Sequence, residues 1–133
     1  MNAVKRLIFS WTTGFSNSSS VDGVFIPTTG WGSAADVAKV RCTWEAFGET
    51  MANMVTRPGF QTANTENSPD TPAAFGNDTQ SSGGLKYSTA MTDISSSTQA
   101  KALVRFGIWV KLPSGSSLNC VRLSGYFDVL APA

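Results

Sequence analysis

Apolar and polar residues alternate within residues 37 to 47, and this pattern limits most strongly what the chain can fold into. A period of two indicates a β-strand with one buried face, because successive side chains point to opposite sides. An amphipathic helix over residues 34 to 54 is the alternative, since Ala, Glu and Met are good helix formers. β-Branched and aromatic residues at alternate positions favour the strand. The apolar face comprises Ala38, Val40, Cys42, Trp44 and Ala46.

Several other segments have strand character, and no segment shows sustained helical periodicity. Segments rich in Gly, Pro, Asn and Ser separate them and supply turns. This pattern predicts an all-β fold, a single-domain antiparallel β-sandwich of jelly-roll or related Greek-key type over residues 1 to 133. The best-defined strands are residues 101 to 111 and 118 to 129, and further strands are expected at 4 to 13, 51 to 56 and 84 to 91.

A long irregular loop is expected at about residues 57 to 84, where Pro, Gly, Asn and Ser are frequent. Loops of this length are usually functional or disordered. Ordering such a segment costs conformational entropy that its few apolar residues offset poorly. Contacts with neighbouring subunits are one source of the missing stabilisation.

The last two strands are expected to pair as a hairpin within residues 105 to 129. Placing Val110 opposite Val121 makes apolar residues face apolar residues, whereas a slip of one residue turns every side chain to the wrong face. The same register brings Trp109 opposite Arg122. It also places Arg105 opposite Tyr126 on the outer face, so the sequence predicts one aromatic and basic patch.

Three interpretations of Trp109 remain open. It is core if a second sheet or the loop at 57 to 84 covers the outer face. It is part of a contact surface if another subunit docks there, since Trp, Tyr and Arg carry much of the energy of protein interfaces. It is a sugar platform if its flat ring stacks on a pyranose.

Trp31 lies in the turn sequence GWGS, outside any strand pattern. It either plugs an edge of the sandwich or contacts a ligand, and the plug is favoured because an exposed indole invites association. Trp11 and Trp44 lie in strands and are expected in the core.

The composition argues against charged partners. Ten basic and nine acidic residues give a formal net charge of +1, and only 14% of the residues are charged. With 17 serines and 14 threonines, the surface is expected to be hydroxylated instead. We therefore expect neither nucleic acid nor a membrane as partner, because proteins that bind either one usually carry a broad positively charged surface.

The residues that most enzymes use are missing or scattered. The chain has no histidine, which excludes Ser-His-Asp and Cys-His catalysis. The acidic residues show neither paired carboxylates nor calcium-loop spacing, so no enzyme activity, metal or cofactor is expected. Cys42 and Cys120 are expected to be free thiols, because alternation turns the first inward and the second outward; one disulfide between them is the alternative.

These observations favour a non-enzymatic structural protein that assembles with copies of itself or with another structural protein, such as a virion-type capsid or decoration subunit. The contacts are expected to come from loops and from the patch of Trp109, Tyr126, Arg105 and Arg122, together with Trp31. The alternative is a carbohydrate-binding module or lectin. The apolar run after Arg6 is too short for a signal peptide, so a virion or assembled particle is the expected location.

Overall fold

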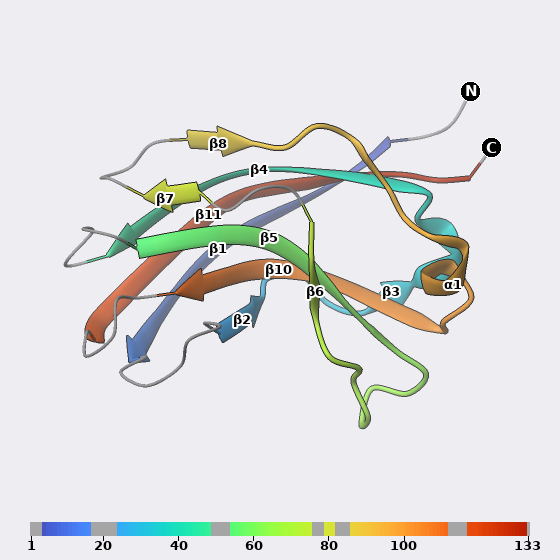
Figure 1. Cartoon of the computed structure of the whole chain (residues 1–133), viewed down its shortest axis with the longest axis horizontal. Coiled ribbons are helices and arrows are strands. Elements are labelled where there is room, and N and C mark those ends of the chain that lie inside the picture. The colour runs from blue at the N-terminus through green and yellow to red at the C-terminus, as the bar shows by residue number, and fades with distance from the viewer. Residues whose placement is uncertain are drawn as a thin grey trace.

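The computed structural model describes residues 4–16, 24–48, 54–75, 79–81, 86–111 and 117–132. These residues form two antiparallel sheets packed face to face, with the short helix α1 (Ser96–Gln99) and the 3-10 turn η1 (Ala34–Asp36) at one end (Figure 1). The all-β sandwich predicted from the alternation is confirmed. No helix in these ranges is long and apolar enough to cross a membrane.

Each sheet is named here after its central long strand. The β11 sheet has the order β1 (Val4–Ser16), β11 (Ser117–Leu130), β4 (Lys39–Gly48) and β8 (Lys86–Ser88), with β9 (Thr92–Asp93) also paired to β4. The β10 sheet has the order β2 (Val24–Pro27), β10 (Leu103–Lys111), β5 (Met54–Ala63) and β6 (Ala73–Ala74). The short strands β3 (Gly32–Ser33) and β7 (Thr79–Ser81) pair with β10 and β5.

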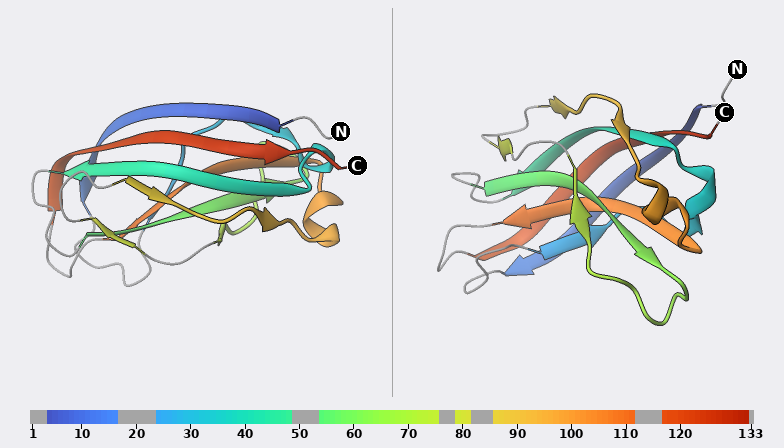
Figure 2. Two further views of the ribbon diagram at one scale, coloured as in Figure 1. Left: turned by 90° about the horizontal axis from the view of Figure 1, so that it is seen from above. Right: turned by 45° about the vertical axis from the view of Figure 1, so that its right-hand side comes forward.

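Successive strands change sheet along most of the chain, but β5 and β6 follow each other in the same sheet. β1, β4 and β11 belong to one sheet, and β2, β5 and β10 to the other (Figure 2). If the two short strands β3 and β9 are left out and β6 and β7 are counted as one, eight strands remain. Numbered 1 to 8 along the chain, they have the order 1-8-3-6 in the β11 sheet and 2-7-4-5 in the β10 sheet. This is the strand order of a jelly roll.

The core lies between the sheets and uses the alternation seen in the sequence. Val40, Cys42, Trp44 and Ala46 of β4 are all buried, so β4 is a strand and the helix alternative for this segment is wrong. Trp44 also bridges the layers, because its Nε1 donates a buried hydrogen bond of 2.9 Å to Oγ1 of Thr56 on β5. The inner face of β10 supplies the opposing apolar residues, Val104, Phe106, Ile108 and Val110.

The predicted hairpin of the last two strands is wrong. β10 pairs with β2 and β5, whereas β11 pairs with β1 and β4. Val110 therefore lies opposite Val24 and Thr56, and Val121 opposite Thr13 and Gly48. The apolar faces of the two strands still meet, but across the interior: the rings of Phe106 and Phe127 are stacked 5.3 Å apart.

Two other expectations need correction. The long loop was expected to begin at residue 57, but β5 continues to Ala63, so residues 57 to 63 belong to a strand. Trp11 is 42% exposed on β1, whereas Trp44 is 2% exposed and belongs to the core as expected. Trp11 differs because β1 is the outermost strand of its sheet and has β11 on one side only.

Candidate functional site

The residues of the predicted aromatic and basic patch divide between the two outer faces of the sandwich. Trp109 and Arg105 project from β10, and Tyr126 and Arg122 project from β11, which lies in the other sheet. The single patch is therefore wrong, and its reason is the hairpin that does not form. Each half has instead acquired partners from strands that the sequence did not pair with it.

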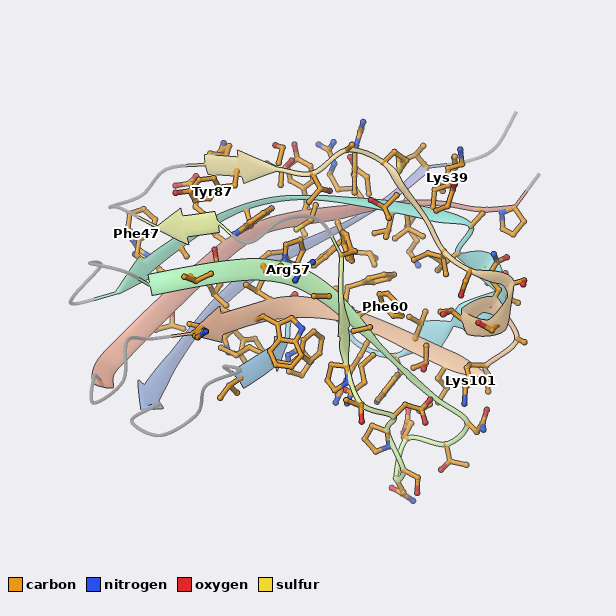
Figure 3. All side chains as sticks on the ribbon, in the orientation of Figure 1. Lys39, Phe47, Arg57, Phe60, Tyr87 and Lys101 are labelled. Carbon is orange, nitrogen blue, oxygen red and sulfur yellow. The ribbon has the colours of Figure 1, made fainter. Side chains whose placement is uncertain are left out.

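On the outer face of the β10 sheet, Trp109 is partly covered by its own chain. Its ring makes an edge-on contact with Phe25 at 5.8 Å between centroids. It also covers Gly59, where an added Cβ would lie 3.0 Å from indole Cδ1 and Nε1. Its cross-strand neighbour Arg57 lies on β5 (Figure 3). The indole Nε1 is buried and has no hydrogen-bond partner among the described residues.

Arg105 connects this face to the turn that carries Trp31. Its Nε and Nη2 donate to Oε1 of Gln61 at 2.9 and 2.7 Å. Its guanidinium carbon lies 4.3 Å from the centroid of the Trp31 ring. Such a stack contributes about 0.5–1 kcal/mol at exposed sites. Trp31 is therefore held against the sandwich, and no local signal in the sequence pointed to Arg105 as its partner.

A pocket of about 510 Å³ opens beside Trp31, between the two sheets. Lys5 and Asp36 are the exposed charged residues of its lining. Thr29 and the indole of Trp31 add a hydroxyl and an aromatic surface. The buried apolar residues of the lining are Val37, Val104, Phe106 and Val129. This lining suits a ligand that has both apolar and hydroxyl groups.

On the outer face of the β11 sheet, Asp128 anchors two arginines. Its Oδ1 accepts from Arg6 Nε at 2.8 Å, and its Oδ2 accepts from Arg6 Nη2 at 3.1 Å and from Arg41 Nε at 2.9 Å. The Asp128 side chain is 1% exposed, whereas those of Arg6 and Arg41 are about half exposed. The hydrogen bonds from Arg6 hold the pKa of Asp128 below its ordinary value, although burial opposes the shift.

Two arginines, Arg6 and Arg122, lie over aromatic rings on this face. The Arg6 guanidinium lies 3.8 Å from the centroid of the Tyr126 ring, and that of Arg122 lies 4.8 Å from the centroid of Phe47. Phe47 lies toward the end of β4 that is farthest from α1 (Figure 3). Sequence reasoning found Tyr126 and Arg122 but missed Arg6 and Asp128. Only the pairing of β1 with β11 brings these two together, so no local signal was available.

Among the residues whose burial the structure describes, the exposed large hydrophobic side chains lie on two strands. They are Val4 (54% exposed), Ile8 (77%) and Trp11 (42%) on β1 and Val24 (40%) on β2. Both strands are outermost in their sheets and lie on the same side of the sandwich, away from β8 (Figure 1). Outer strands with exposed apolar side chains are sites where proteins associate.

In the described part of the chain, the thiol and the acidic side chains do not gather into a metal-binding cluster. Cys42 is a free, fully buried thiol, and burial raises its pKa far above the ordinary value, which makes it unreactive. The side chain of Cys120 lies outside the described residues, so its state stays a prediction. Within the described ranges, no three Cys, Asp or Glu side chains cluster so that they could hold a metal.

No protein-family model and no curated protein matches this chain. Several solved structures of virus particles do resemble it. A chain from infectious bursal disease virus, Gt strain, has a TM-score of 0.62 and 10% identity, over 98% of this chain and 33% of that chain. The VP2 subviral particle of this virus has a TM-score of 0.60 and 11% identity, over 98% of this chain and 32% of that chain. The T13 particle of the virus has a TM-score of 0.61 and 9% identity, over 98% of this chain and 31% of that chain.

This chain thus spans about a third of the length of these viral chains. At such identities the likeness shows the fold alone. The shared fold is the two-sheet β-sandwich described above.

Proposed function

We propose that this chain is a non-enzymatic structural subunit that assembles with copies of itself, in a virion-type particle or a similar assembly. Fold likeness alone is weak support, because one fold hosts many functions. The observation that carries the proposal is the strip of exposed Val4, Ile8, Trp11 and Val24 on β1 and β2. Burying such side chains contributes about 1.5–3 kcal/mol each, which favours association.

The outer face of the β11 sheet adjoins this strip and extends the proposed contact. Tyr126 and Arg122 are the residues of the original prediction that lie there. Arg6 already stacks on Tyr126, so part of the side-chain ordering that an interface requires is complete before binding. Trp109 and Arg105 on the other face form a second proposed contact. Another structural protein is the alternative partner, and a net charge of +1 gives no reason to propose nucleic acid or a membrane.

Light scattering over a range of concentrations tests the proposal, with electron microscopy to show any closed particle. We expect a mass several times the 14.1 kDa of one chain. Replacing Trp11 and Val24 by serine removes apolar area from the strip, so it should shift the assembly toward single chains. Lys86→Ala on β8, at the other side of the sandwich, is the control and should leave the mass unchanged. A single-chain mass at every concentration would refute the proposal.

Carbohydrate binding is the second candidate, and the pocket beside Trp31 favours it. An indole, the Thr29 hydroxyl and the charges of Lys5 and Asp36 are groups that sugars use for stacking and hydrogen bonding. Retention on immobilised polysaccharides tests it. Trp31→Ala should abolish the retention while the far-ultraviolet circular dichroism stays unchanged. Passage of the native chain through every such column would leave this candidate without support.

A further inference from the structure

We propose that β1 pairs antiparallel with β1 of a second copy, about a two-fold axis at Ile8, so that the two β11 sheets become one continuous sheet. This inference rests on the proposed function, because it names the contact through which the copies assemble. It is carried by three features of β1: the direction of its free backbone groups, the position of its most exposed apolar residue and the placement of its charges.

The hydrogen bonds of β4 show which backbone groups of β1 face the open edge. The N–H of Cys42 donates to Thr89 Oγ1 at 3.0 Å, and its C=O accepts from the Thr89 N–H at 2.9 Å. The backbone groups of Cys42 therefore point away from β11. Phe127, which lies opposite Cys42, must then direct its own groups to the other side, toward Leu7 of β1.

Backbone groups alternate in direction along a strand, so those of Leu7 are used by β11 and those of its neighbours are not. The pairing of β1 with β11 is continuous from Val4 to Thr13. The N–H and C=O groups of Arg6, Ile8 and Ser10 consequently point to the open edge. Among the described strands, β1 pairs only with β11, so these groups form a row that a further strand can bind.

The distribution of side chains selects a second β1 as that further strand and sets its register. Centring the pair on Ile8 places the most exposed large apolar side chain of the described residues, at 77%, against its own copy. It also brings Lys5 beside Trp11 of the second copy, where an ammonium group and an indole attract each other. Arg6 then faces Ser10, and Val4 faces Thr12.

Charge repulsion opposes registers that are centred on the first residues of β1. Lys5 and Arg6 are the charged residues of β1, and both lie near its beginning. Centring the pair on either of them would place like charges directly opposite each other, which is destabilising. With the axis at Ile8, the two Arg6 residues are offset by four positions, or about 13 Å along the strands at about 3.3 Å per residue. This exceeds the screening length of about 8 Å at physiological salt.

Disulfide trapping tests the register. Ile8→Cys is prepared in a Cys120→Ser background, while the buried Cys42 stays in place. Opposed residues of a hydrogen-bonded antiparallel pair have Cα atoms about 5.5 Å apart, within the range that a disulfide bridges. We expect mild oxidation to link most of the Ile8→Cys protein into dimers. Ser10→Cys, offset by four residues from its own copy, is the matched control and should stay unlinked.

A second pair of variants tests the edge without a cross-link. Ile8→Lys adds a charge at the proposed axis, and we expect at least a tenfold weaker association by light scattering. Ser88→Lys adds the same charge on β8, at the opposite edge of the same sheet, and should leave association unchanged. Amide hydrogen exchange gives an independent readout, because the N–H groups of Arg6, Ile8 and Ser10 should exchange slowly only in the assembled protein.

The outcomes separate this inference from the proposed function. A chain that never associates overturns both. A chain that associates, with no Ile8→Cys link and no effect of Ile8→Lys, overturns only the β1 pairing. Equal linking of Ser10→Cys overturns the register, and linking of Ile8→Cys only to a different added protein overturns pairing between copies.

Discussion

The two outer faces of the sandwich each stack an arginine on an aromatic ring, but they anchor that arginine differently. On the β11 face, Arg6 lies over Tyr126 and is bound through two hydrogen bonds to the buried carboxylate of Asp128. On the β10 face, Arg105 lies over Trp31 and is bound to the neutral amide of Gln61. One face therefore depends on a buried charge and the other does not.

The difference teaches where each face is sensitive. Breaking a buried ion pair leaves a charge without its partner. This costs far more free energy than leaving a neutral amide unpaired. The β11 face should thus be the more rigid and the more dependent on pH. The β10 face should respond mainly to the loss of packing and of neutral hydrogen bonds.

The largest effect is expected from Asp128→Ala. Removing one member of a buried charge cluster costs about 3–5 kcal/mol. Arg6 and Arg41 are about half exposed and regain water, so we expect a loss of about 2–3 kcal/mol in the free energy of unfolding. Urea unfolding measures it. Asp93→Ala is the control, because Asp93 pairs with Lys39 while 84% exposed, and should change stability by less than about 0.5 kcal/mol. If Asp128→Ala and Asp93→Ala lowered the free energy of unfolding equally, burial of the carboxylate would not explain its contribution.

Acidification is expected to act next, and mainly on the β11 face. The folded-state pKa of Asp128 is lowered, chiefly by the hydrogen bonds from Arg6, so its carboxylate stabilises the fold above the unfolded-state pKa of about 3.9. That contribution should be lost as the pH falls through the lower folded-state value. The pKa of Asp70 is also lowered, chiefly by the Thr62 hydroxyl, and acts in the same direction.

Unfolding curves between pH 7 and pH 2 should therefore show a plateau and then a steep loss of stability below about pH 4. Asp128→Asn should flatten that loss more than Asp70→Asn does, because only Asp128 is both buried and bound to two arginines. The reverse order would contradict the comparison of the two faces.

The smallest effect is expected on the β10 face. Gln61→Ala removes the amide that accepts two hydrogen bonds from Arg105 and donates one to the backbone oxygen of Asp70. We expect a loss of about 1–1.5 kcal/mol by thermal unfolding, without a change in the pH profile. Gln99→Ala is the matched control, because its amide donates to the Ile94 carbonyl without binding an arginine, and should cost less. A loss as large as that of Asp128→Ala would show that a neutral anchor is equivalent to a charged one.

The failed hairpin shows what a local pairing rule misses. Matching apolar residues of the last two strands assumed that strands adjacent in the sequence pair in one sheet. Here the last two long strands, β10 and β11, lie in different sheets, so the same match is satisfied across the core, as Phe106 and Phe127 show. The predicted fold and the predicted hairpin were incompatible, and the fold was right.

The second half of β5 shows how tertiary contacts override local signals. Pro58 and Gly59 are residues that usually interrupt strands, and they led to the expectation of a loop. Both lie inside β5. Gly59 belongs there because Trp109 and the Ala73 carbonyl approach so closely that an added Cβ would lie 3.0 and 2.8 Å from them. A residue 50 positions away explains this glycine, and no reading of residues 57 to 63 alone would have found it.

By itself the sequence determined the all-β class and the buried face of β4, because alternation fixes which side of a strand is apolar whatever the strand pairs with. It also identified most long strands and some of the arginines and aromatic residues of the surface, but not Arg6. Tertiary structure alone decided which of these residues meet, including Arg6 with Asp128 and Arg105 with Trp31. The physical reason is that strand pairing joins distant segments through backbone hydrogen bonds that are chemically alike, so the choice of partner depends on how the whole core packs.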